Sequence, residues 1–310
     1  MGRALFLFVG LPVISFLAVL TQNPFTGNPG ISGNRSVSQK IAAEDPKCTD
    51  CHSDLIEKKI LHEPAKDGCD NCHQVNINDH TQKGVNGLHL TEKMPELCYT
   101  CHDGTKKDVD TTRVVHQAVK VKKLCLNCHS PHSTDAKKLL IADKKELCLT
   151  CHDKDADSTG KKLVNIKKLL KTSKVIHPAI AGGCTSCHKA HASTENFLLI
   201  SAYPKGQYVA GNKDSYAVCW ECHDVDLFGL AKTATSTNFR DGERNLHFLH
   251  VNREKGRSCS ICHNVHATNN LHLIVDKVPF GEWTMPMNYT PSDSGGSCAP
   301  GCHGYAQYKR

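Results

Sequence analysis

The longest apolar stretch of the chain lies at its N-terminus. Residues 4–20 (ALFLFVGLPVISFLAVL) contain no charged side chain and follow a short basic start, MGR. This layout predicts either a secretory signal peptide in residues 1–21 or a retained membrane anchor, because no small-x-small cleavage site follows and the length is at the short limit for a spanning helix. Residues 22–46, rich in Asn, Gly, Pro and Ser, predict a flexible linker. Both alternatives place the rest of the chain outside the cytoplasm.

Beyond residue 46 few apolar runs are long enough to predict a regular element. Residues 161–174 (KKLVNIKKLLKTSK) carry apolar side chains at 163, 166 and 170, which predicts a basic amphipathic helix. Residues 275–297, rich in Pro and aromatic residues, predict an irregular loop. The expected fold class is therefore mostly irregular, with short α-helices and little or no β-sheet.

Composition indicates that side chains alone do not fill the interior. The 310 residues include 18 cysteines, but only 6% are aromatic. Chains that lack a sufficient core use disulfides, metals or cofactors. The formal net charge of +7, taken alone, would suggest an acidic partner such as nucleic acid or a membrane surface.

The cysteines form nine pairs, and a histidine directly follows each pair. Eight pairs have the form Cys-x-x-Cys-His, while the ninth has one extra residue between its cysteines, and no cysteine is left over. The motifs are CTDCH (48–52), CDNCH (69–73), CYTCH (98–102), CLNCH (125–129), CLTCH (148–152), CTSCH (184–188), CWECH (219–223), CSICH (259–263) and CAPGCH (298–303).

Three interpretations of these motifs compete. Disulfides require an even number of cysteines but give no reason for the histidines. Zinc knuckles act two at a time, and nine do not pair. Attachment of c-type haem explains every position, because the two thiols bind the haem vinyl groups and the histidine is the proximal iron ligand.

We therefore interpret the chain as carrying nine covalently bound c-type haems. The attachment residues are Cys48, Cys51, Cys69, Cys72, Cys98, Cys101, Cys125, Cys128, Cys148, Cys151, Cys184, Cys187, Cys219, Cys222, Cys259, Cys262, Cys298 and Cys302, and the proximal ligands are His52, His73, His102, His129, His152, His188, His223, His263 and His303. Nine haems would fill the interior, and their ionised propionates would offset the basic charge, so that no nucleic-acid partner is expected.

Eleven further histidines are available as distal ligands, and their positions are regular. One group precedes the second motif of a pair by seven or nine residues, and another follows the second proximal histidine by three. The distal candidates are His62, His116, His177 and His250 in the first group, His132, His191 and His266 in the second, and His80 in the divergent first pair, where His89 is the alternative. The roles of His89, His247 and His272 and the distal ligand of the ninth haem stay open, with Met285 and Met287 as possible sulfur ligands or loop-packing residues.

The short spacing of the second group has a geometric consequence. Residues three apart lie on the same side of a turn, whereas two axial ligands approach an iron from opposite faces. His132 is therefore expected to bind a different haem from the one that His129 binds, and so to hold two haems close together.

Similar sequences recur with a period of about 45–55 residues and two motifs per repeat. The predicted division is a first di-haem unit 47–95, a second 96–145, a third 146–216, a fourth 217–275 and a C-terminal ninth-haem segment 276–310.

Residues 48–274 resemble the bacterial multihaem c-type cytochromes with doubled CXXCH motifs, most specifically in CHSPH, CHKAH and CHNVH. The resemblance implies a fold organised around covalently bound haems and a periplasmic or outer-envelope electron carrier with mostly bis-histidine haems. On this interpretation the helix predicted at residues 161–174 covers haems with its apolar face, or binds a membrane or an acidic redox partner. Possible partners are other redox proteins of the cell envelope, a membrane quinol-oxidising complex or a porin–cytochrome conduit, with membrane contact through the N-terminal segment.

An iron with six ligands has no open position for a substrate, which favours an electron carrier over an enzyme. The alternative is a multihaem oxidoreductase with one open catalytic haem, for which the ninth site, with its odd spacing, is the candidate. No cysteine pair is followed by lysine, as it is at the catalytic haem of one well-known type of multihaem nitrite reductase.

Overall fold

The structure is a computed structural model that describes residues 47–80, 82, 87–156 and 163–310. The signal or anchor predicted in residues 1–21 and the linker predicted in residues 22–46 lie outside the described residues. Glu44–Arg310 is one compact unit, separate from Met1–Ala43. Among the described residues, no helix is both long and apolar enough to cross a membrane.

Short helices form at the cysteine motifs, as the sequence predicts. The first motif of each predicted unit contributes to an α-helix, and the second to a single 3-10 turn. The α-helices are α1 (Cys48–His52), α2 (Glu63–Asp67), α3 (Ile77–His80), α4 (Glu96–Tyr99), α5 (Asp103–Thr111), α6 (Lys144–Leu149), α7 (Ile166–Thr172), α8 (Ala217–Trp220), α9 (Asp226–Gly229) and α10 (Leu246–Val251). The 3-10 helices are η1 (Ser53–Leu55), η2 (Cys69–Asn71), η3 (Gln117–Val119), η4 (Leu124–Asn127), η5 (Lys137–Leu139), η6 (Pro178–Gly182), η7 (Cys184–Ser186), η8 (Asn196–Leu198), η9 (Lys213–Tyr216), η10 (Cys259–Ile261) and η11 (Leu271–Leu273).

The expectation of little or no sheet needs a qualification, because the described residues form several small antiparallel sheets of two or three strands. The strands are β1 (Ile60–Leu61), β2 (His73–Val75), β3 (Leu88–Leu90), β4 (Val114–Val115), β5 (Ser133–Thr134), β6 (Val175–Ile176), β7 (Ala192–Ser193), β8 (Arg240–Asp241), β9 (Arg244–Asn245), β10 (Ala267–Thr268), β11 (Lys277–Phe280), β12 (Trp283–Pro286), β13 (Thr290–Ser292), β14 (Gly295–Cys298) and β15 (Ala306–Lys309).

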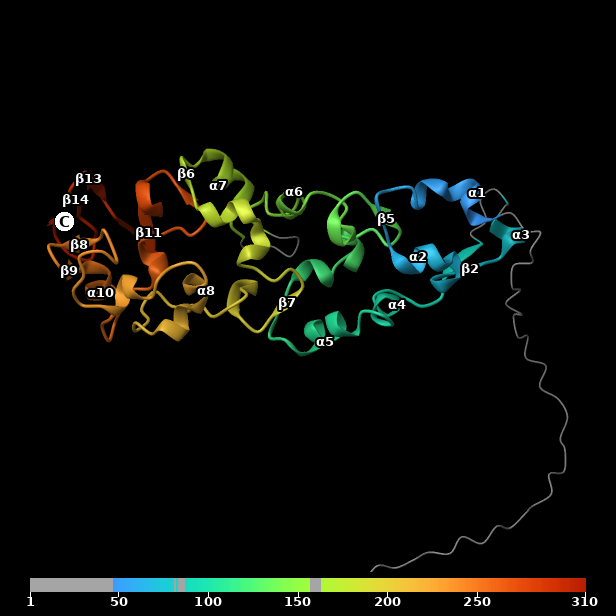
Figure 1. The fold of residues 1–310 in the computed structure, drawn as a ribbon, viewed down its shortest axis with the longest axis horizontal. Helices are drawn as coiled ribbons and strands as arrows, with labels where there is room; N and C mark the ends of the chain where they lie inside the picture. The colour runs from blue at the N-terminus through green and yellow to red at the C-terminus, as the bar shows by residue number, and fades with distance from the viewer. Residues whose placement is uncertain (1–46, 81, 83–86, 157–162) are drawn as a thin grey trace, which may run out of the picture. The chain divides into compact units, whose positions relative to one another are not determined.

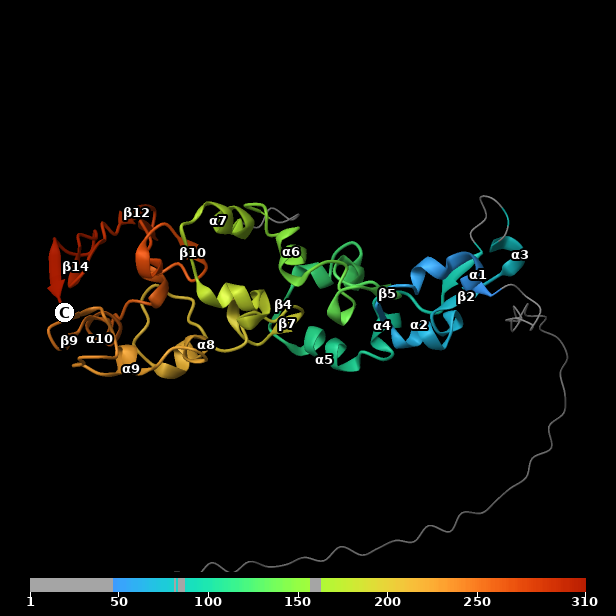
Figure 2. The ribbon, with the colours of Figure 1, turned by 45° about the horizontal axis from the view of Figure 1, so that its top comes forward.

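Three of these sheets join neighbouring repeats. Strand β1 of the first unit pairs with β5 of the second, β4 of the second with β7 of the third, and β6 of the third with β10 of the fourth. In each pair the residue after the first strand donates its backbone N–H to the carbonyl of the residue before the second. These bonds are His62 N to His132 O (2.8 Å), His116 N to His191 O (2.8 Å) and His177 N to His266 O (2.9 Å). Figures 1 and 2 show the joined units following one another in chain order from α1 to β14.

The irregular loop predicted for residues 275–297 is wrong. Strands β11 and β12 form a regular hairpin in which Phe280 pairs with Trp283 across a two-residue turn. Gly281 opens this turn with a φ of 60°, a conformation that glycine adopts at little cost. Residues 290–298 then enter a three-stranded sheet with β15. The prolines in this segment argue against strands in the sequence, so the hairpin was not predicted.

The core built from side chains is small. The described residues include twelve buried apolar side chains, and seven of them form two separate clusters rather than one continuous core. One cluster contains Tyr216, Phe228 and Val251, and the other joins Ile261 and Val278 to Met285 and Met287. Side chains therefore leave most of the interior to be filled by something else.

Candidate functional site

Histidine side chains meet in pairs throughout the described chain. Nine pairs have ring centroids about 6 Å apart, and each joins one histidine of a cysteine motif to one histidine outside the motifs. The pairs are His52–His80 (5.9 Å), His73–His132 (6.1 Å), His102–His62 (6.2 Å), His129–His191 (6.1 Å), His152–His116 (6.3 Å), His188–His266 (6.2 Å), His223–His177 (6.1 Å), His263–His247 (6.3 Å) and His303–His250 (6.4 Å).

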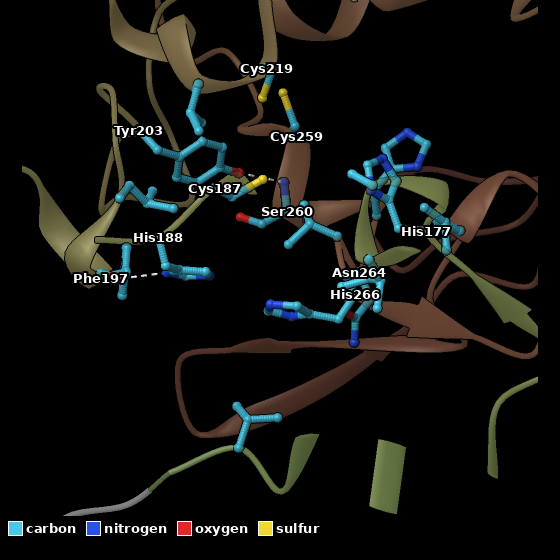
Figure 3. A pocket seen from close by; sticks show the side chains of 18 of the residues that line it. His177, Cys187, His188, Phe197, Tyr203, Cys219, Cys259, Ser260, Asn264 and His266 are labelled. Atoms are coloured by element: carbon cyan, nitrogen blue, oxygen red, sulfur yellow. Dashed lines mark hydrogen bonds between the residues drawn. The ribbon is translucent and has the colours of Figure 1, made fainter. Parts of the chain in front are cut away.

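This spacing fits a metal ion between the two rings. Histidine nitrogen binds a first-row metal at about 2.0–2.1 Å, so two such bonds and the two half-rings span roughly 6 Å between ring centres. Figure 3 shows one pair, in which His188 and His266 point toward one another across a gap. The narrow range of the nine distances favours one common occupant over nine accidental contacts.

The partners come from neighbouring units in a reciprocal exchange. His62, in the first unit, faces His102 of the second, while His132 of the second unit faces His73 of the first. The same exchange repeats between the second and third units, and between the third and fourth. Each small inter-unit sheet therefore positions two histidines that serve sites on opposite sides of a unit boundary.

Hydrogen bonds orient many of these imidazoles. The Nδ1 atoms of His62 and His116 lie 2.8 and 2.9 Å from the carbonyl oxygens of Pro131 and Ala190. Similar backbone contacts hold His129, His188, His250, His263 and His303. A carbonyl can only accept, so Nδ1 carries the proton and Nε2 is free to bind a metal.

Burial keeps several of these rings neutral. Desolvation, with a smaller effect from His263, lowers the pKa of His247 to about 3. Desolvation, and then His188, lowers the pKa of His266 to about 4. The neutral imidazole is the form that ligates metals.

The cysteines line the same space. A continuous cavity of about 4070 Å³ runs past motif cysteines and paired histidines from Cys125 to His303. Ordinary small-molecule pockets have volumes of about 300–1,000 Å³, so this cavity can hold several large groups. Leu163, Ile166 and Leu170, the apolar positions of the predicted amphipathic helix, line it as well, although only residues 166–172 form the helix.

Thiols of consecutive motifs lie close together. Within each unit the thiols of the first cysteines of the two motifs lie side by side, as Figure 3 shows for the adjacent sulfurs of Cys219 and Cys259. The other such pairs are Cys48–Cys69, Cys98–Cys125 and Cys148–Cys184. The cysteine pairs, the facing histidines and the cavity together fit covalently attached haem.

The structure also places the residues whose roles the sequence left open. His247 faces His263, and His250 faces His303, although both lie on α10. His89 lies exposed on β3, and His272 is exposed with its carbonyl bonded to His263. The sequence did contain a signal for His247. No later pair of motifs in the printed sequence offers a distal histidine to the fourth unit, so one of its own histidines is needed there.

The two methionines lie to one side of the ninth motif rather than opposite its histidine. Met285 and Met287 are buried with Ile261 and Val278, and the Met285 sulfur lies 3.4 Å from the thiol of Cys302. They pack against the segment, while His250 lies across from His303.

Comparison with protein families bears on these motifs. The family model for the doubled CXXCH motif matches residues 62–107, 116–157 and 177–227. The chain carries the doubled CXXCH motif. This motif indicates covalently bound c-type haem and is consistent with a multihaem c-type cytochrome. A search among curated proteins found no match.

The register of these matches agrees with the exchange of histidines. Each match begins at the distal candidate of one unit and contains the second motif of that unit and the first motif of the next. The doubled motif thus spans the boundary at which histidines are exchanged. The predicted boundaries of the di-haem units stay a prediction.

Proposed function

We propose that this chain is a nine-haem c-type cytochrome that carries electrons through closely packed, bis-histidine haems in the periplasm or cell envelope of a bacterium. The observation that carries the proposal is the set of nine histidine pairs, each joining a motif histidine to a histidine outside the motifs at about 6 Å.

Each part of the chain has a defined task in this proposal. The two cysteines of a motif would hold the haem through thioether bonds, and the following histidine would bind its iron through Nε2. The partner histidine, in most cases from the neighbouring unit, would be the second iron ligand. Backbone carbonyls such as those of Pro131 and Ala190 hold the Nδ1 protons, which fixes the direction of each ring.

The ninth motif follows the same scheme in spite of its extra residue. His303 faces His250, and its Nδ1 is bonded to the carbonyl of Gly304. Because a distal histidine lies opposite every motif histidine, the arrangement supports closed, six-coordinate sites. We therefore propose an electron carrier rather than an enzyme with an open iron.

Contacts between motifs support transfer in chain order. Cysteines of successive units lie near one another in the pairs Cys72–Cys98, Cys128–Cys151 and Cys187–Cys222, and Cys262 lies near Cys298. Together with the thiol pairs inside each unit, this proximity supports an order in which every motif lies next to its successor in the sequence. Bound haem supplies one-electron redox chemistry, with potentials set by axial ligands, second-shell hydrogen bonds and burial.

Location and partners follow from the same proposal. Haem attachment of this type and the apolar N-terminal segment support an exported protein that exchanges electrons with other redox proteins of the envelope. A membrane quinol-oxidising complex or a porin–cytochrome conduit is the kind of assembly in which such a carrier would act.

The test is an optical titration of the full-length, dithionite-reduced protein with carbon monoxide, combined with a haem assay. Nine haems per chain with sharp low-spin bands that carbon monoxide does not change are the expected result. A carbon monoxide-induced shift in about one-ninth of the Soret amplitude would reveal an open iron and replace the carrier with the enzyme alternative.

A further inference from the structure

Three proximal histidines share a backbone feature that no side chain in the motif explains. The Nδ1 atoms of His129, His188 and His263 lie 2.9, 2.9 and 2.8 Å from the carbonyl oxygens of Lys138, Phe197 and His272. In every case the accepting residue is nine positions after the histidine. Figure 3 shows the contact between His188 and Phe197.

Each accepting residue begins a pair of left-handed residues. The φ values are 61° and 55° at Lys138 and Leu139, 58° and 58° at Phe197 and Leu198, and 58° and 59° at His272 and Leu273. Two consecutive non-glycine residues in this region are strained, and such strain persists where the surrounding structure requires it.

The strained pair turns two carbonyls back toward the motif. The first accepts from the imidazole, and the second accepts from the backbone N–H of the residue after the proximal histidine. The second bonds are Ser130 N to Leu139 O (2.9 Å), Lys189 N to Leu198 O (2.6 Å) and Asn264 N to Leu273 O (2.9 Å). The first residue of the pair is Lys, Phe or His and is exposed in all three cases, so its backbone rather than its side chain is used.

Among its described residues, the first unit lacks this left-handed pair. Its chain returns to the motif through the β2–β3 hairpin, in which His73 pairs with Leu90, seventeen residues later. In the other units the corresponding bridges are His129 to Leu140, His188 to Leu199 and His263 to Ile274, eleven residues later. No left-handed pair occurs in the described residues of this hairpin, and the buried Nδ1 of His73 has no partner among the described residues.

We propose that Lys138, Phe197 and His272 are positioning residues whose backbone carbonyls lower the reduction potentials of the haems on His129, His188 and His263. By the same reasoning, the haem on His73 is the most positive of these four equivalent sites. The inference rests on the proposed haem ligation. A hydrogen bond from Nδ1 to a carbonyl makes the imidazole a stronger electron donor and stabilises the oxidised iron.

The sites of His73, His129 and His188 form a matched comparison. Their opposite histidines, His132, His191 and His266, occupy the same position of the repeat, and none has a hydrogen bond to Nδ1 among the described contacts. These three sites therefore differ in the hydrogen bond to the proximal Nδ1, which His129 and His188 have and His73 lacks among the described residues.

The test uses Phe197→Val and Phe197→Gly in the full-length holoprotein. A β-branched side chain disfavours the left-handed conformation, whereas glycine adopts it freely. Phe197 is 59% exposed, so both variants lose little packing. In a spectroelectrochemical titration, Phe197→Val should move about one-ninth of the α-band amplitude to a more positive potential, and Phe197→Gly should overlay the wild type.

Valine and glycine variants of Lys138 and His272 should show the same difference in potential. Each position should affect a different ninth of the α-band amplitude. If a valine variant retains fewer than nine haems, Phe197→Ala replaces it, with a smaller shift of the same sign expected. Equal curves for the valine, alanine and glycine variants, or a shift to more negative potential, would overturn the inference. The control His188→Ala tests the ligation separately. An unchanged low-spin spectrum in that variant would refute the proposed haem ligation rather than the effect of the carbonyl on the potential.

Discussion

His132 provides the sharpest test of the proposed ligand exchange, because on the proposed ligation it could serve either the haem of His129 or the haem of His73. The motif CHSPH places it three residues after His129, yet its ring lies 6.1 Å from that of His73 in the preceding unit. On the proposed ligation, replacement by alanine would remove one of eighteen axial ligands and open one iron in nine. We expect His132→Ala to bind one carbon monoxide per chain and to shift about one-ninth of the reduced Soret amplitude.

Removal of an attachment site identifies the iron that opens. Combining His132→Ala with Cys69→Ala and Cys72→Ala deletes the haem that His73 would hold, and carbon monoxide binding should disappear. Combining it instead with Cys125→Ala and Cys128→Ala should leave one carbon monoxide bound. The opposite pattern would show that His132 serves His129 and would refute the exchange.

The spare residues provide the matched controls. His89 and His272 are exposed and face no motif histidine. His89→Ala and His272→Ala should therefore retain nine haems and remain insensitive to carbon monoxide, because neither side chain lies opposite a motif histidine. Carbon monoxide binding in either variant would show that the pairing at about 6 Å does not identify the ligands.

Three further predictions follow from the same geometry. His247→Ala and His250→Ala should each open a different iron, and the double variant should bind two carbon monoxide molecules; a single molecule would mean that both histidines serve one site. On the proposed ligation the imidazole of His266 stays neutral in the folded holoprotein, and burial also lowers its pKa, whereas the unfolded chain protonates it below about pH 6.5. The free energy of unfolding of the holoprotein should therefore fall as the pH is lowered from about 6.5, and denaturant titrations with no pH dependence below that value would contradict it. With twelve buried apolar side chains among the described residues, the haem-free chain should be unfolded by circular dichroism, and a cooperative melt would count against this.

The sequence was sufficient to predict the attachment chemistry and the general character of the fold. Eighteen cysteines in nine motifs left one consistent interpretation, and short helices do form at eight of those motifs. The repeat register also singled out seven of the nine histidines that face a motif histidine, and His80 was one of two alternatives in the divergent first pair. The ninth, His247, could not be chosen from sequence because His250 and His272 lie close to it in the chain.

The small sheets could not be predicted for a physical reason. Strands of two residues, such as β1 and β5, are too short to show the alternation that identifies a strand. Their pairing joins residues more than seventy positions apart, and only the three-dimensional arrangement of the units brings them together. The left-handed pairs were equally hidden, because Lys, Phe and His give no sign of the conformation that Gly or Asn would suggest.

The ends of the repeat explain why its first and last units depart from the pattern. An inner unit gives a histidine to each neighbour and receives one from each, so a terminal unit lacks one donor. At one end, His80 on α3 of the same unit faces His52, where an earlier unit would have supplied the partner. At the other end, His247 replaces the histidine that a fifth unit would have brought to His263, and His250 faces the appended ninth motif.

Terminal repeats of linear arrays are commonly modified to close the structure, and here the modification is a substitute ligand. On the proposed ligation, the chain supplies both axial ligands at all nine sites and needs no second molecule to complete any of them. The extra residues of the β2–β3 hairpin bring His80 to His52, and the same insertion replaces the left-handed pair that the other units place beside their proximal histidine. The pairing of His80 with His52, and the Nδ1 of His73 that has no partner among the described residues, thus both accompany a single change in the repeat.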